Sequence, residues 1–209
     1  LGDVYKRQPL YWSILDGTRA WFSSNYQKRV AADLGIGYVF VERDNWWEWN
    51  YDFEARFRIT NQLFLIHYWE QRFQNNSEGY ALSFGIPETA YEGIIFGNRN
   101  RINTTQTLGI DYTLTNRIGI TFRLRNYNAI INYNSFSELL NNGRLNTLNN
   151  YSGNDVNGNS VYDINYNAFT IDMLFRWVFF PGSEINIVWK NSIFSENNKI
   201  TQKYWKTLF

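Results

Sequence analysis

The sequence contains no cysteine among its 209 residues. Disulfide scaffolds, cysteine-ligated metals and thiol catalysis are therefore excluded. No apolar run approaches the length of about 18 residues that a membrane-spanning helix requires, and the mean hydropathy is −0.45, so helical membrane proteins are excluded as well. The 20 Lys and Arg residues exceed the 19 Asp and Glu residues by only one. This balance argues against nucleic acid as a partner, because a surface that follows phosphates needs a clear basic excess.

Methionine is nearly absent too: the single Met173 lies deep in the chain, so translation does not begin at Leu1. We therefore interpret the chain as a fragment of a longer protein. Residues 3–8 read DVYKRQ, which resembles a frame translation of the adapter used in transposase-based sequencing libraries. A natural basic turn is the alternative. We attribute residues 1–8 to such an adapter and infer the fold from residues 9–209.

Aromatic residues and asparagine dominate what is present. Phe, Tyr and Trp make up 19% of the chain, 28 residues are Asn, and charged residues account for only 19%. A chain with so much aromatic surface and so little charge can bury enough apolar area to offset the entropy of ordering. Intrinsic disorder is therefore excluded.

Strict alternation marks one long strand at 46–60, whose sequence is WWEWNYDFEARFRIT. One set of alternate positions is apolar and comprises Trp47, Trp49, Tyr51, Phe53, Ala55, Phe57 and Ile59. The intervening set is polar and comprises Glu48, Asn50, Asp52, Glu54, Arg56, Arg58 and Thr60. Successive side chains of a strand point to opposite faces, so the pattern predicts a strand with one apolar and one charged face.

The same alternation recurs in other parts of the chain. It is clear at 29–41 and 169–179. Less regular segments that are rich in β-forming residues lie at 63–73, 102–114, 118–130 and 184–196. A weaker pair of strands is predicted at 80–85 and 90–97, which brings the count to about ten, an even number that closed barrels allow. Helical spacing with capping signals is not evident.

The length of these segments separates two all-β architectures. Strands of soluble sandwiches average about five or six residues, whereas the segments here run to about 11–14 residues. At about 3.3 Å per residue and a tilt near 40°, such a strand extends about 30 Å along a barrel axis, enough to cross the hydrocarbon core of a membrane. We therefore expect an all-β fold with the long antiparallel strands of an outer-membrane-type β-barrel, present as an incomplete, open barrel.

The connections between the predicted strands differ in length in a regular way. Short turns are predicted at 27–28, 60–62, 116–117 and 181–182. Longer polar links are predicted at 42–45, 74–79 and 98–101, and a long loop at 131–164. Counted in order, the short turns fall at one end of the sheet and the long links at the other. Outer-membrane barrels alternate short periplasmic turns with longer extracellular loops, so we expect the long loop to lie outside the cell.

The C-terminal third carries a recognisable motif, FTIDMLFRWVFFPGSEINIVWKNSI at 169–193. Its RW, PGS and VW elements resemble the signature of a Bacteroidota-type family catalogued as a domain of unknown function (number 5916). The runs at 94–124 and 132–145 resemble the preceding hairpin and loop of that family, so the resemblance covers about half of the chain. The most specific matches are Arg176, Trp177, Pro181, Gly182, Ser183, Val188 and Trp189.

The resemblance implies the C-terminal outer-membrane barrel region of a protein with an upstream, family-nine-like carbohydrate-binding domain. It also implies that members continue with a spacer and a last strand beyond the segment that matches 191–200. We therefore expect residues 9–209 to be a barrel domain fragment that is truncated at both ends.

The motif also has a physical interpretation of its own. Pro181 fixes φ and Gly182 supplies a positive φ, which predicts a type II turn that reverses the strand. Trp177 and Trp189 flank this turn and would anchor the hairpin in the interfacial region of a membrane. We therefore assign the motif a structural role.

Few residues could carry chemistry. His67 is the only histidine, and a Ser-His-Asp triad, a histidine metal site or a histidine acid/base pair would have to use it. Its place between apolar neighbours favours a packed or lumen-lining residue. The loop at 152–163 resembles a calcium loop only loosely, because Gly153 stands where the first carboxylate ligand belongs. An Asn-Gly turn is the better interpretation.

The carboxylates of the strand at 46–60 could form an acid/base pair. Arg56 and Arg58 are predicted on the same face, so ion pairing in a polar lumen is favoured. The predicted lumen-lining charges are Glu48, Asp52, Glu54, Arg56, Arg58, Arg123, Arg125 and Asp172. No residue is assigned a catalytic, cofactor-binding or metal-binding role, and no cofactor is inferred.

Together these patterns predict an outer-membrane β-barrel domain of a cell-surface protein whose activity the sequence does not specify. Outer-membrane lipid is the expected partner, oligosaccharide is a further one through the upstream domain, and nucleic acid is not expected. Two alternatives stay open: an outer-membrane hydrolase with its site on the lumen rim, and a soluble all-β binding module of the cell surface. The oligomeric state is left open.

Overall fold

The computed structural model describes residues 15–41, 45–81 and 94–197. These residues form one antiparallel sheet of nine strands, and no helix occurs among them. The strands are β1 (Asp16–Ser23), β2 (Val30–Val41), β3 (Trp46–Arg58), β4 (Leu63–Tyr80), β5 (Ile95–Thr115), β6 (Ile118–Leu139), β7 (Leu145–Thr147), β8 (Ile164–Phe180) and β9 (Ser183–Asn197). The predicted all-β fold of long antiparallel strands is confirmed.

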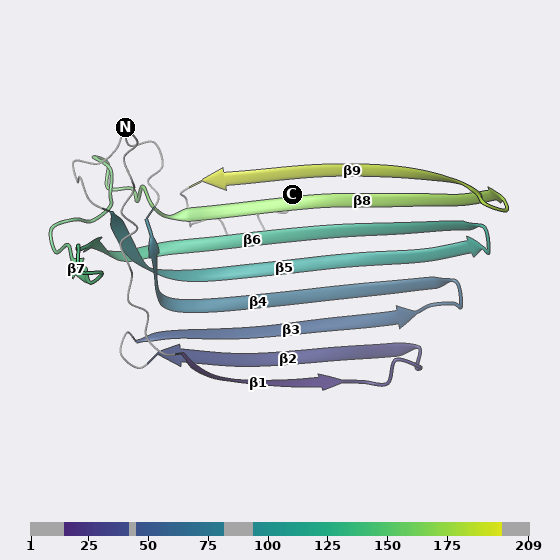
Figure 1. Ribbon diagram of the computed structural model, residues 1–209, viewed down its shortest axis with the longest axis horizontal. Coiled ribbons are helices and arrows are strands. Elements are labelled where there is room, and N and C mark those ends of the chain that lie inside the picture. The colour runs from purple at the N-terminus through teal and green to yellow at the C-terminus, as the bar shows by residue number, and fades with distance from the viewer. Residues whose placement is uncertain (1–14, 42–44, 82–93, 198–209) are drawn as a thin grey trace.

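Consecutive strands pair with each other from β1 to β6, and β8 pairs with both β6 and β9 (Figure 1). The short β7 pairs only with β6 and lies beside the main path of the sheet. The order is therefore β1-β2-β3-β4-β5-β6-β8-β9. Within the described residues β1 and β9 form two separate edges, and the sheet does not close on itself. This agrees with the predicted open sheet.

The register of the sheet follows from the alternation in the sequence. Trp49 lies opposite Tyr38 of β2 and Phe73 of β4. Leu34 and Trp69 lie opposite Phe53 in the same way. A slip of one residue would move every aromatic side chain of β3 to the charged face, so the pattern excludes registers that differ from the observed one by an odd number of residues.

The strands are joined alternately at the two ends of the sheet. The connections of β1 to β2, β3 to β4, β5 to β6 and β8 to β9 lie at the right-hand end of the sheet in Figure 1. We call this the turn end. β2, β4 and β6 end, and β3, β5 and β8 begin, at the other end, the loop end. The predicted difference in length does not hold throughout, because residues 24–29 join β1 to β2, whereas the shorter segment 42–45 joins β2 to β3. Gly182 has a φ of 77°, which confirms the positive φ predicted for the last turn.

The predicted strand boundaries are wrong at the loop end. The polar segments 74–79 and 98–101 are not links: they belong to β4 and β5, which run for 18 and 21 residues. The predicted separate pair at 80–85 and 90–97 is replaced by the end of β4 and the start of β5, and residues 82–93 lie outside the described residues. A register shift between Gln74 and Ser77, with Asn76 at a φ of 54°, lets this Asn-rich chain continue the ladder.

The predicted loop at 131–164 is also shorter than expected. β6 continues to Leu139, so only about the last two thirds of that segment connect β6 to β8, and β7 lies within them. β6 pairs with β5 along this part of its length. Polar side chains do not end a strand whose backbone groups are hydrogen-bonded to a neighbouring strand.

A small hydrophobic core lies at the loop end. It consists of Ala81, Ile95, Phe136, Val161 and Tyr162, with Tyr133, Leu148 and Tyr151 packed against it. Phe136 and Tyr162 are 2% and 1% exposed, and their ring centroids lie 4.7 Å apart. The Tyr133 backbone N–H donates to Asp163 Oδ1 at 2.9 Å. The connection from β6 to β8 is thereby held against the sheet.

Candidate functional site

Charge is confined almost entirely to one face of the sheet, which we call the polar face. The register places every Lys and Arg residue of the strands on it: Arg19, Arg56, Arg58, Arg72, Arg99, Arg101, Arg123, Arg125, Arg176 and Lys190. Most strand carboxylates, including Glu48, Asp52, Glu70 and Asp172, share this face. The opposite face, the apolar face, carries most of the large hydrophobic side chains.

The two faces differ in exposure in the opposite sense to a water-soluble protein. On the apolar face Leu34 is 52% exposed and Trp49 is 43% exposed. On the polar face Glu48 is only 8% exposed. Charged residues are rarely buried unless paired, and large contiguous apolar patches are rarely exposed in soluble monomers. The sheet therefore exposes large side chains on its apolar face while it buries one carboxylate on its polar face.

On β5, β6, β8 and β9 the hydrophobic part of the apolar face is concentrated toward the turn end. This apolar belt comprises Leu108, Ile110, Tyr112, Ile118, Ile120, Phe122, Leu124, Ile171, Met173, Phe175, Trp177, Ile185, Ile187 and Trp189. A row of polar residues ends it toward the loop end, and we call this row the polar band: Gln71, Thr104, Gln106, Asn126, Asn128 and Asn167.

Hydrogen bonds between side chains satisfy the polar band. Gln71 Nε2 donates to Thr104 Oγ1 at 3.2 Å, and the Tyr51 hydroxyl donates to Gln71 Oε1. Asn126 Nδ2 donates to Asn167 Oδ1 at 2.8 Å. Thr104 and Asn128 are 4% and 2% exposed, so these bonds offset the cost of burying polar groups.

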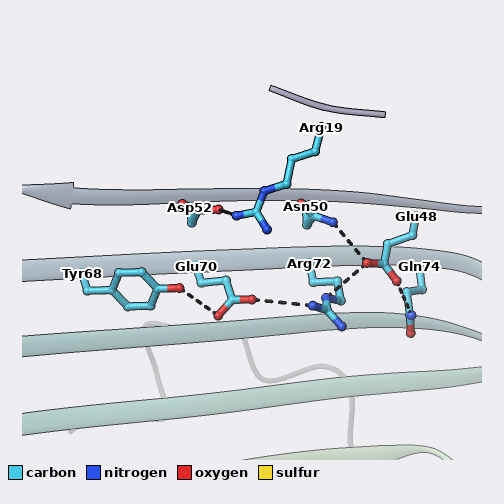
Figure 2. A network of polar contacts seen from close by, with 8 residues as sticks. All are labelled: Arg19, Glu48, Asn50, Asp52, Tyr68, Glu70, Arg72 and Gln74. Atoms are coloured by element: carbon cyan, nitrogen blue, oxygen red, sulfur yellow. Dashed lines mark hydrogen bonds and ion pairs between the residues drawn. The ribbon is translucent and has the colours of Figure 1, made fainter. Parts of the chain in front are cut away.

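A polar network extends over the polar face from β1 to β4 in two separate groups of contacts, one of Arg19 with Asp52 and the other around Glu48, Arg72 and Glu70 (Figure 2). Arg19 contacts Asp52 at 2.7 Å, and Arg72 contacts both Glu48 at 3.3 Å and Glu70 at 3.8 Å. Glu48 also accepts from two side-chain amides, Gln74 at 2.6 Å and Asn50 at 3.3 Å. The Tyr68 hydroxyl donates to Glu70 at 3.1 Å. Each carboxylate in the network thus has a basic partner.

Glycine makes room for this network on β2. A Cβ at Gly35 would clash with the Asp52 carboxylate, and a Cβ at Gly37 would clash with the Asn50 amide. Both side chains of β3 therefore lie across backbone that carries no side chain. The close approach of these two side chains explains why Gly35 and Gly37 occupy the predicted strand 29–41.

Three further ion pairs lie toward the turn end. Arg56 contacts Glu54 at 2.8 Å, Arg125 contacts Asp172 at 3.0 Å, and Arg176 contacts Glu184 at 2.9 Å. The arginine side chains are about half exposed, so the pairs of Arg56 and Arg125 each contribute on the order of 0.2–1 kcal/mol. Their main effect is to keep the face polar rather than to hold the sheet together.

Two open hollows lie along the polar face. One, of about 540 Å³, is lined by Arg19, Asp33 and Asp52 with Trp21, Phe22, Ser23 and Leu34. The second, of about 350 Å³, is lined by Arg123, Arg125, Asp172 and Lys190 with Thr121, Met173, Leu174 and Val188. Each contains an ion pair described above. The geometry does not bring two unpaired carboxylates together in either hollow.

All eight charges predicted to line a lumen lie on the polar face: Glu48, Asp52, Glu54, Arg56, Arg58, Arg123, Arg125 and Asp172. Six of them form the ion pairs just described. The Arg58 guanidinium lies 5.4 Å from the centroid of the Phe64 ring instead. The lumen itself stays a prediction, because only the shared face is observed.

The motif residues take the places that a hairpin requires. Trp177 and Trp189 lie on the apolar face and are 42% and 47% exposed, whereas Arg176 lies on the polar face and pairs with Glu184 across the turn. Val188 precedes Trp189 in the sequence and lies on the opposite, polar face. Pro181 and Gly182 form the turn, and Ser183 begins β9.

His67 and the loop at 152–163 lie apart from the polar network. His67 is on the apolar face, opposite Ala55 and Leu108. Asp155 Oδ1 accepts hydrogen bonds from the backbone N–H groups of Asn157 and Asn159 at 2.9 and 2.8 Å. The hydrogen bonds from Asn159, and to a smaller extent the one from Asn157, hold the pKa of the Asp155 carboxyl below its usual range. The described residues contain no group of three or more His, Cys, Asp or Glu side chains placed to hold a metal ion.

The sequence interpretation missed Arg19, Tyr68, Glu70, Arg72 and Gln74, which complete the network in Figure 2. The last four alternate along β4, a segment that was recognised only as irregular. Their shared spacing of two residues was the available signal. Arg19 offered none, because its partner is 33 residues away in the sequence.

Among the described residues, no helix is both long and apolar enough to cross a membrane. Comparison with curated proteins and with solved structures finds no match. The family model of the Domain of unknown function (DUF5916) matches residues 8–209, which is nearly the whole chain. The chain therefore belongs to the DUF5916 family.

Proposed function

We propose that the chain is part of an outer-membrane β-barrel domain of a cell-surface protein, with lipid against the apolar face and the polar face lining a lumen. The observation that carries the proposal is the division of the two faces. Every basic residue of the strands lies on the face where Glu48 is buried, and many large side chains of the other face, among them Leu34, Trp49 and Trp189, are exposed. Strands that alternate apolar outside and polar inside are typical of such barrels.

The height of the apolar belt is smaller than that of a complete membrane-facing band. The belt extends over five residues of β5 and β9 and seven residues of β6 and β8, which at about 3.3 Å per residue and a tilt near 40° corresponds to roughly 13–18 Å. The apolar band of outer-membrane barrels is about 25 Å high, so the proposal rests on the division of the two faces and not on the height of the belt. The polar band then marks the membrane boundary, and β5 and β6 continue beyond it by about ten residues each.

The ends of the sheet support one orientation. The short turns would lie in the periplasm and the long connections outside the cell, as in other barrels of this class. The loop-end core fits that placement, because a connection that faces water needs apolar contacts of its own.

The wider context of the domain rests on the family resemblance alone. We propose a Bacteroidota-type surface protein with an upstream carbohydrate-binding domain, so that the barrel would hold a glycan-binding or glycan-processing unit at the membrane. An outer-membrane hydrolase is the first alternative and would place its catalytic groups at the rim of the lumen. A soluble surface module is the second, and its apolar face would need to pack on another element.

Arginine substitutions on opposite faces of β3 test the membrane proposal. Phe53→Arg places a charge on the apolar face and should cost roughly 2–4 kcal/mol in a bilayer, enough to prevent assembly. Glu54→Arg, on the neighbouring residue of the polar face, serves as the matched control and should be tolerated. Both variants of the full-length protein are refolded in lipid, and the folded fraction is measured by protease resistance.

Equal folding of the two variants in lipid would contradict the proposal. Release of the wild-type protein into buffer without detergent would instead favour the soluble module. A catalytic constellation in the full-length sequence, together with hydrolytic activity of the refolded protein, would favour the hydrolase.

A further inference from the structure

Three arginine side chains gather on the polar face near the loop end. Arg99 and Arg101 are neighbours on that face of β5. Arg72 comes from the adjacent β4 and lies opposite Asn103 of β5. Gln74 lies opposite Arg101. We call these three residues the arginine cluster.

Only one of the three arginines of the cluster has a carboxylate partner among the described residues. Arg72 contacts both Glu48 and Glu70, whereas Arg99 and Arg101 form no ion pair within 15–41, 45–81 and 94–197. By contrast, Arg19, Arg125 and Arg176 each have a carboxylate within 3.0 Å. Five of the ten basic residues of the strands thus have a carboxylate partner among the described residues, and Arg99 and Arg101 are two neighbours that have none.

Several polar atoms of this region are buried without a partner. The Nε atoms of Arg99 and Arg101 have no hydrogen-bond acceptor, and Gln74 Oε1 and Asn103 Oδ1 have no donor. A buried donor that loses its water partners without gaining another is unfavourable. Both guanidinium groups therefore carry a donor that no acceptor of the described residues satisfies.

Electrostatics point in the same direction. The cluster lies beyond the polar band, outside the apolar belt. Burial lowers the pKa of Arg101, and the positive charges of Arg99 and Arg72 lower it further. The guanidinium nevertheless stays charged at neutral pH, because its ordinary pKa is above 12. Like charges held together in a half-buried place favour the binding of an anion.

The local structure holds Arg99 in position. Its guanidinium lies across Gly79, where a Cβ would clash with it. Arg99 Nη1 donates to the Tyr133 hydroxyl at 2.9 Å, and the guanidinium lies 5.6 Å from the centroid of the same ring. Tyr133 in turn packs on the loop-end core. The donor groups are therefore fixed before a ligand arrives, which reduces the entropy cost of binding.

We propose that the arginine cluster binds an oxyanion group, the sulfate or phosphate of a small molecule or saccharide, on the polar face below the connection from β6 to β8. A guanidinium offers parallel N–H donors that match two oxygens of such a group. The Arg99 and Arg101 side chains supply the charge, and the Gln74 and Asn103 side chains, whose amides also carry N–H donors, lie beside them. The proposal does not depend on the membrane location.

Binding of inorganic sulfate and inorganic phosphate to the purified full-length protein tests this site. Calorimetric titrations are run at constant ionic strength with chloride as the replaced anion. Sulfate or phosphate should bind saturably, and the anion with the higher affinity identifies the ligand class. Arg101→Gln should lower the affinity by about tenfold or more, since it removes a charged donor. Arg176→Gln, the control, removes an arginine that already has a carboxylate and should leave the affinity unchanged.

A second measurement separates a binding site from a structural role. In chloride alone, Arg101→Gln should melt at the same or a higher temperature than the wild type, because it relieves repulsion within the cluster. Added sulfate should raise the melting temperature of the wild type and not of the variant. Should Arg101→Gln fail to fold, Arg101→Lys keeps the charge, loses the fork and should still bind more weakly. Equal effects of chloride and sulfate, or equal losses in Arg101→Gln and Arg176→Gln, would overturn the proposal.

Discussion

The hairpin of β5 and β6 contains two regions of opposite design on the same backbone. At its turn end, Leu108, Ile110, Ile120 and Phe122 cover the apolar face. At its loop end, the same face carries Thr104, Asn126 and Asn128, and the large side chains Tyr133 and Phe136 pack on the other face. The loop end has a hydrophobic core of its own, and under the membrane proposal lipid would cover the apolar face of the turn end. One ladder of backbone hydrogen bonds can run through both regions, because backbone pairing does not depend on side-chain type.

The largest expected effect concerns the core of the loop end. Tyr162 is 1% exposed, and its hydroxyl contacts that of Tyr151, while burial raises its pKa. Tyr162→Ala should destabilise the loop-end core by about 3–5 kcal/mol, the range for large aromatic residues. The connection from β6 to β8 should become sensitive to protease while the turn end keeps its protection from hydrogen exchange. Loss of protection along the whole of β5 and β6 would show that the two regions are not independent.

A matched pair of isoleucines on β6 sharpens the comparison. Ile120 and Ile130 lie on the same face, one within the apolar belt and one beyond the polar band. Ile120→Arg should cost about 2–4 kcal/mol in a bilayer, whereas Ile130→Arg should cost about 0–1 kcal/mol, because the penalty falls toward the membrane surface. Unfolding by denaturant in lipid vesicles measures both values. Equal costs would remove the polar band as a boundary.

The smallest effect is a local response to pH at the loop end. The folded pKa of Asp155 lies below its ordinary value, so the carboxylate stabilises its turn above the unfolded pKa, and this contribution disappears as the pH falls through the folded pKa. The loss therefore occurs below pH 3.8. The amide resonances of Asn157 and Asn159, whose N–H groups bond to Asp155, should titrate with a midpoint below 3.8. A midpoint at or above 3.8 would show that the turn does not form in solution.

The two regions also differ in how far the sequence predicts them. At the turn end, strict alternation and the Pro181-Gly182 pair predicted strands, faces and turns that the structure confirms. At the loop end, Asn-rich segments such as 74–79 were interpreted as links although they lie within strands. Asparagine disfavours strands only as an intrinsic tendency, and pairing on both sides outweighs it.

The sequence by itself determined the all-β class and the confinement of Glu48, Asp52 and Arg56 to one face. Each follows from a period of two, which a strand converts directly into faces. Only the tertiary structure decided which cations find carboxylates. Arg19 reaches Asp52 across an intervening strand, while Arg99 and Arg101 meet Arg72 instead. Partners that lie across a sheet are set by register over long sequence separations, and no local pattern records them.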